Sequence, residues 1–121
     1  MTQELQIFST IAVQTALEAL APQFEAESGF RLRVTWNTAP VLVKRLQGGE
    51  TADVLILNRA GIDTMIRDGR ILSGSEVTLA SSATAIAIKA GAARPDISTP
   101  EALKQTLLTA RAISYTDPAA G

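Results

Sequence analysis

The chain has 121 residues, of which 46% are hydrophobic and 19% are charged, and its formal net charge is −1. This length suits one domain with a real core and is short for two complete ones. The near-neutral charge argues against a nucleic-acid binder, whose footprint is a basic surface. The chain contains no cysteine or histidine, which excludes disulfides, histidine bases and the commonest zinc ligands. We therefore expect neither a metal nor a cofactor.

Three strand-like segments occur in the first half of the chain. Residues 30–36 alternate apolar side chains with charged or polar ones, which predicts a strand with one solvated face. Residues 53–57 are Asp-Val-Leu-Ile-Leu, a run typical of a central strand covered on both faces. Together with residues 5–8, these segments predict three strands of one sheet.

Segments with helical spacing of their apolar residues separate these strands. The first expected helix covers residues 11–28, and Pro22 predicts a kink or a break within it. A second is bracketed by Pro40 at its start and Gly48 at its end, the positions that these two residues prefer. Residues 62–68 predict a third helix, which a glycine follows.

The second half of the chain is expected to add one helix and further strands. Thr99 and Pro100 begin this helix with a hydroxyl cap and a proline in the first turn. Apolar runs at residues 77–80, 84–88 and 112–115 predict three strands. The alternation of strands and helices predicts an α/β fold, a mixed or mainly parallel sheet with helices on both faces.

The first two strand-to-helix junctions are the best candidates for a binding site. Open α/β sheets bind ligands beyond the carboxyl ends of their strands, where helix N-termini point backbone N–H groups at the solute. We expect the two junctions to form a cradle for a small anion. Its candidate residues are Ser9, Thr10, Ile11 and Ala12 at the first junction, and Asn37, Thr38 and Ala39 at the second.

Side-chain donors at these junctions have two possible roles. The hydroxyls of Ser9 and Thr10 either donate to a ligand or cap the helix that follows. At the second junction Asn37 and Thr38 offer side-chain donors, whereas Pro40 removes one backbone N–H.

Three more candidate residues lie outside the two junctions. Asn58 and Arg59 follow the third strand, where the guanidinium either meets a carboxylate in the cleft or is a solvated surface group. Thr116 follows the last expected strand and is a candidate ligand contact, whereas Asp117 would repel an anion and is expected to cap a turn. No nucleophile with its base and no pair of carboxylates supports catalysis, so we expect a binder and not an enzyme.

Six stretches occur in a characteristic order and spacing, at residues 7–9, 20–25, 28–29, 42–49, 52–54 and 117–121. In this order they resemble the type II periplasmic solute-binding proteins, and within them the molybdate-binding branch. The resemblance covers essentially the whole chain. It implies the fold predicted above, arranged as one lobe and the start of a second.

The same resemblance implies a domain organisation. Residues 1–82 are expected to form the N-terminal part of the first lobe, and residues 83–121 the crossover and the incomplete beginning of the second. Two lobes of usual size need roughly twice this length, so we interpret the chain as a fragment. Apolar sheet edges left exposed in such a fragment predict a possible homodimer through exposed or exchanged segments.

The resemblance also implies a solute receptor for a small, molybdate-like oxyanion. It would be the substrate-binding component of an ABC-type importer, with a permease as its partner. Ala12 and Ala39 stand where the molybdate branch places serines, so a small carboxylate is the alternative ligand.

A cytosolic small-ligand sensor of the same fold is the alternative function. It is favoured because residues 1–4 lack the basic start of a signal peptide. The location is periplasmic if a signal peptide was removed and cytoplasmic otherwise. No apolar run approaches the roughly 20 residues that span a bilayer, and no nucleic-acid partner is expected.

Overall fold

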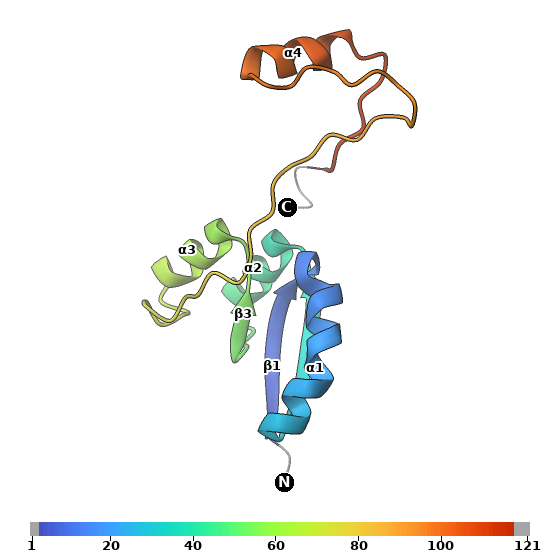
Figure 1. Cartoon of the computed structure of the whole chain (residues 1–121). Coiled ribbons are helices and arrows are strands. Elements are labelled where there is room, and N and C mark those ends of the chain that lie inside the picture. Colours follow the sequence, from blue (N-terminus) through green and yellow to red (C-terminus); the bar gives the residue numbers. More distant parts are fainter. Residues whose placement is uncertain (1–2, 118–121) are drawn as a thin grey trace. The chain divides into compact units, whose positions relative to one another are not determined.

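The computed structural model describes residues 3–117. They divide into two compact units, residues 3–77 with Asp117 and residues 78–116. No helix in the described part of the chain is long and apolar enough to cross a membrane. In chain order (Figure 1) the elements are β1 (Gln3–Thr10), the 3-10 helix η1 (Ile11–Val13), α1 (Gln14–Ser28), β2 (Phe30–Asn37), α2 (Ala39–Gln47), β3 (Val54–Ile56), α3 (Arg59–Arg67) and α4 (Pro100–Thr109).

The sheet of the first unit has three parallel strands in the order β2-β1-β3. The central strand β1 pairs with β2 along its whole length, up to Thr10 opposite Asn37. Its residues 7–9 pair with β3 on the other side. The sheet and its helices confirm the predicted α/β class. The order reverses between β1 and β3, which is where open α/β sheets bind their ligands.

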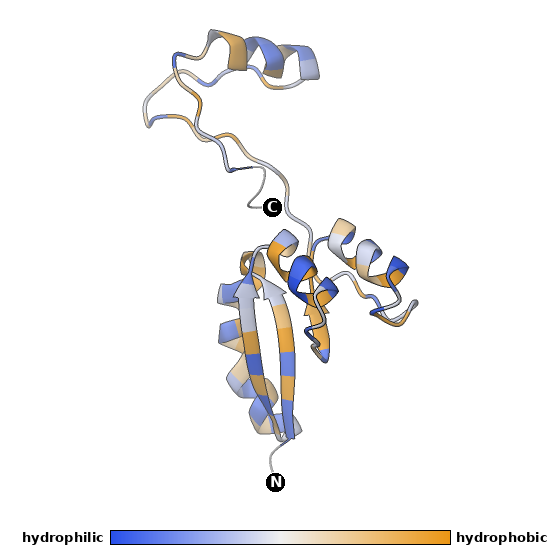
Figure 2. Cartoon of the chain, turned by 180° about the vertical axis from the view of Figure 1, so that it is seen from behind, coloured by the Kyte–Doolittle hydropathy of each residue, from blue (hydrophilic) through white to orange (hydrophobic). Residues whose placement is uncertain are grey.

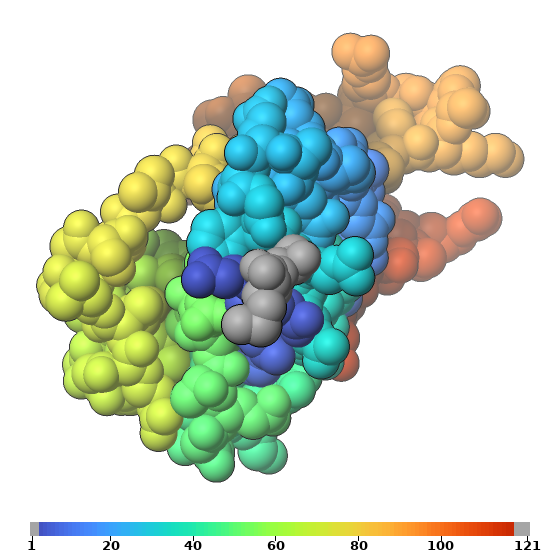
Figure 3. Space-filling model, turned by 90° about the horizontal axis from the view of Figure 1, so that it is seen from below, coloured from blue at the N-terminus to red at the C-terminus, as the bar shows by residue number. Residues whose placement is uncertain are grey.

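At the start of β3, the residue before this strand and a residue of β1 exchange two hydrogen bonds. The Asp53 N–H donates to the Gln6 carbonyl oxygen at 2.8 Å, and the Gln6 N–H donates to Asp53 Oδ2 at 2.8 Å. Seen from the amino end of the sheet, the segment that leads into β3 lies beside the start of β1 (Figure 3). Asp53 is therefore a structural residue that fixes the register of β3.

Helices cover both faces of the sheet, with α1 on one face and α2 and α3 on the other (Figures 1 and 2). A buried cluster of Phe8, Leu42, Leu46 and Met65 lies on the second face, and Ile7 and Ala39 are also buried. The Arg45 guanidinium lies 5.0 Å from the centre of the Phe8 ring and covers this core from the solvent side. Helix α1 contributes no buried residue of its own, whereas α2 and α3 contribute Leu42, Leu46 and Met65 to the cluster.

Side chains of α1 occupy part of the outer edge of β2. The Leu32 N–H donates to Glu25 Oε1 at 2.7 Å, and the Phe30 N–H donates to Ser28 Oγ at 3.2 Å. Unpaired N–H groups at a sheet edge are a template for another strand. The outer edge of β2 is therefore partly blocked by its own preceding helix.

The helices agree with the sequence in number and differ from it in detail. The expected first helix begins with a 3-10 turn, and α1 continues through Pro22, so the break does not occur and the kink stays a prediction. Pro22 and Glu18 are both exposed, so the carbonyl that lacks a donor can bind water. Helix α3 begins earlier than predicted, at Arg59, because Asn58 caps it.

The second unit, residues 78–116, contains the expected helix α4. Thr99 Oγ1 accepts a hydrogen bond from the Ala102 N–H at 3.1 Å and caps it. The Asp96 carboxylate accepts hydrogen bonds from the N–H and the hydroxyl of Ser98, which lower the pKa of Asp96. The Thr106 hydroxyl donates to the Asp96 carbonyl oxygen at 2.9 Å and joins the helix to this turn.

The strands predicted at residues 77–80, 84–88 and 112–115 are wrong. These residues are exposed and form no strand in the described part of the chain. A strand is stable only when a neighbour takes up its N–H and C=O groups. None of the three described strands pairs with them, so their apolar pattern alone does not make them strands.

Candidate ligand-binding site

Three strand ends lie side by side at the carboxyl edge of the sheet. Thr10 ends β1 and is the register partner of Asn37, which ends β2. On the other side of β1, Ile56 ends β3 opposite Ser9, and Asn58 follows two residues later. Neighbouring strands are about 4.8 Å apart. The register therefore places the two predicted junctions next to each other and adds a third beside them.

The first junction contains one buried hydroxyl and one that the helix does not use. Ser9 is completely buried, and its hydroxyl donates to the Thr10 carbonyl oxygen at 3.1 Å. Thr10 is half-buried and makes no side-chain capping hydrogen bond to η1. Ile11 and Ala12 follow as exposed residues of the 3-10 turn. Of the two roles weighed for the Thr10 hydroxyl, the capping role does not occur.

At the second junction an asparagine side chain is oriented by the backbone. Asn37 Oδ1 accepts a hydrogen bond from the Thr38 N–H at 2.9 Å. Because the Thr38 N–H needs an acceptor, the side-chain atom that faces it must be the amide oxygen of Asn37. The Nδ2 group of Asn37 then remains as a donor. Thr38 precedes α2 and makes no side-chain capping bond, and the buried Ala39 and then Pro40 begin the helix.

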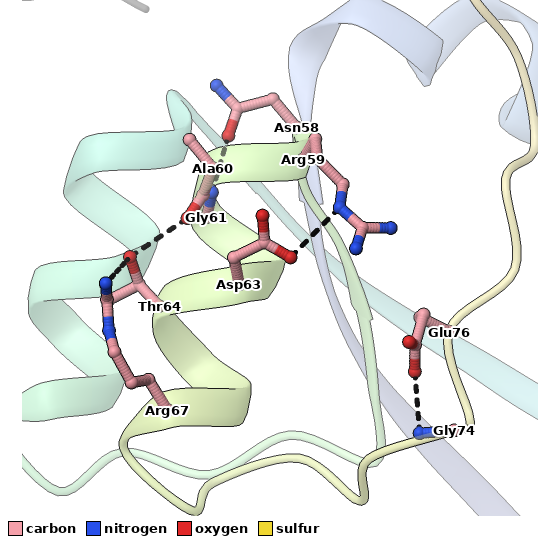
Figure 4. A network of polar contacts seen from close by, with 9 residues as sticks. All are labelled: Asn58, Arg59, Ala60, Gly61, Asp63, Thr64, Arg67, Gly74 and Glu76. Atoms are coloured by element: carbon pink, nitrogen blue, oxygen red, sulfur yellow. Dashed lines mark hydrogen bonds and ion pairs between the residues drawn. The ribbon is translucent and has the colours of Figure 1, made fainter.

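The third junction repeats this arrangement at the start of α3. Asn58 Oδ1 accepts a hydrogen bond from the Gly61 N–H at 2.9 Å, and its Nδ2 is directed away from the helix (Figure 4). A Cβ on Gly61 would lie 3.1 Å from Asn58 Oδ1 and 3.2 Å from Leu57 Cβ, so glycine permits this close approach. Asn58 is a candidate ligand contact from the sequence, and the structure adds its capping role, which an asparagine before a helix can signal.

Arg59 is occupied by an ion pair within its own helix. Its Nε lies 2.9 Å from Asp63 Oδ1, and the Arg59 side chain is 72% exposed. Of the two roles weighed for Arg59, this geometry is that of the solvated surface group. Thr116 is exposed in the second unit, and its contact with a ligand stays a prediction.

The electrostatics of the edge favour an anion. The first turns of α2 and α3 contain no acidic residue, and the same is true of η1 and α1. Helix N-termini carry a partial positive charge that attracts anions. Among residues 3–117 there is no cluster of acidic side chains that could hold a metal ion. The edge thus combines neutral donors with a positive field.

Two comparisons with known proteins bear on this chain. Residues 5–121 match a protein family described as "Bacterial extracellular solute-binding protein". An aconitate isomerase from a Pseudomonas species is 31% identical in a 122-residue alignment, which covers 97% of this chain and 47% of that protein. The chain therefore spans about half the length of the curated relative that it matches.

These comparisons correct one expectation and support another. The expectation that the chain is not an enzyme is contradicted by the relative, which is named for an isomerase activity. That expectation relied on missing histidine and cysteine, but acidic, lysine and tyrosine side chains also transfer protons, and all occur here. The expected relation to solute-binding proteins is supported, although the molybdate-binding type is not confirmed. The match over residues 5–121 shows that this chain belongs to the bacterial extracellular solute-binding proteins, which bind small solutes.

Proposed function

We propose that the full-length protein binds a small carboxylate at the carboxyl edge of β2, β1 and β3. The observation that carries this proposal is the set of donors at the three strand ends: the Thr10 hydroxyl and the Nδ2 groups of Asn37 and Asn58. Neutral donors and helix N-termini hold anions without a countercharge. Hydrogen bonds to a charged group are about twice as strong as neutral ones.

A carboxylate fits the chain better than a tetrahedral oxyanion. Ala12 and Ala39 bring no hydroxyl to positions where the molybdate branch is expected to have serine. Each missing hydrogen bond to a charged ligand costs about 1.5–3 kcal/mol. The relative is named for aconitate, an unsaturated tricarboxylate, which favours the same ligand class.

The relative also supports a second proposal, that the full-length protein isomerises its carboxylate ligand. If the protein is an isomerase, the donors at this edge of the sheet hold the substrate in position. The receptor role in an ABC-type importer is the competing proposal, which the solute-binding family supports. Neighbouring genes for a permease and an ATPase, and an upstream signal sequence, would favour the periplasmic receptor; their absence would favour a cytoplasmic protein.

Calorimetry on the full-length protein tests the ligand class. We expect cis-aconitate, trans-aconitate or succinate to bind at least about tenfold more tightly than molybdate or sulfate, which corresponds to the loss of one charge-assisted hydrogen bond. Tight molybdate binding with no carboxylate binding would overturn the proposal. Proton NMR of the bound and released aconitate then separates the two roles, because an isomerase converts one isomer to the other and a receptor does not.

A further inference from the structure

We draw no further inference here: the strongest candidate, the exposed apolar face that Leu20 and Phe24 form on α1, carries none, because nothing among the described residues shows what covers it.

Discussion

Asn58 links the stability of α3 to the ligand edge, because its Oδ1 accepts from the Gly61 N–H while its Nδ2 faces outward. Asn58→Ala removes the cap and should lower the free energy of unfolding by about 1 kcal/mol. Asn58→Asp keeps the capping oxygen and should change it by less than about 0.5 kcal/mol. Urea denaturation of the full-length protein measures both. Equal losses in the two variants would show that the cap does not stabilise α3.

Arg45 and Glu50 form a two-point ion pair at the end of α2. Arg45 Nε and a terminal guanidinium nitrogen lie 2.8 and 2.6 Å from the two Glu50 carboxylate oxygens. The side-chain hydrogen bonds from Arg45 lower the pKa of Glu50. A carboxylate with a lowered pKa in the folded state stabilises the fold above its unfolded pKa. This contribution is lost as the pH falls through the folded pKa.

NMR titration of the Glu50 side-chain carbon tests this pair. We expect a Glu50 pKa below the usual value for glutamate in the wild type and a return toward that value in Arg45→Met. Arg67→Met is the control, since Arg67 contacts Thr64 and not Glu50. An unchanged Glu50 pKa in Arg45→Met would contradict the pairing.

At the scale of elements, the fold depends on the packing of α2 and α3 against β1. Leu42 and Met65 are completely buried in this core. Leu42→Ala should lower the free energy of unfolding by about 2–5 kcal/mol, because it removes buried methyl groups and leaves a cavity. Leu72→Ala is the control and should cost less than about 0.5 kcal/mol, since Leu72 is 78% exposed. Chemical denaturation measures the free energy of unfolding of the two variants. Equal decreases in the two variants would show that Leu42 is not part of the core.

The elements that the sequence predicted correctly are those whose signals are local. The alternation in 30–36 and the Thr99–Pro100 helix start reappear in the structure, and the apolar run at 53–57 contains β3. The prediction that this run is a central strand covered on both faces is wrong, because β1 is central among the described strands and Val54 of β3 is 42% exposed. The prediction of three strands after residue 76 was wrong, because a strand forms only when a second segment pairs with it. An apolar run in the sequence does not indicate which segment it would pair with.

The candidate site was predictable in place but not in detail. Strand-to-helix junctions can be recognised in the sequence, and they predict Thr10 and Asn37 as candidate site residues. The side-by-side arrangement follows from register, which no local pattern encodes. The orientation of the Asn58 amide depends on a hydrogen bond from the Gly61 N–H, and that of the Arg59 side chain depends on an ion pair with Asp63. Only the folded helix creates these two contacts.

At the scale of the whole molecule, the two edges of the sheet differ. Side chains of α1 occupy part of the β2 edge, whereas β3 is the other edge strand and its Val54 is 42% exposed. We therefore predict that the 121-residue chain self-associates through β3 at high concentration. Light scattering should show dimers for the wild type and fewer for Val54→Lys, because a lysine on an edge strand opposes pairing. A monomer at every concentration would contradict the prediction.

The central position of β1 has a consequence for biosynthesis. This strand is synthesised before the two strands that flank it, and the second of them ends only at Ile56. At about 5–20 residues per second, β1 waits several seconds for its full set of partners. During that delay its apolar residues Ile7 and Phe8 lack the packing that buries them in the folded chain, so this part of the nascent chain exposes an unpaired apolar strand until β3 has been made.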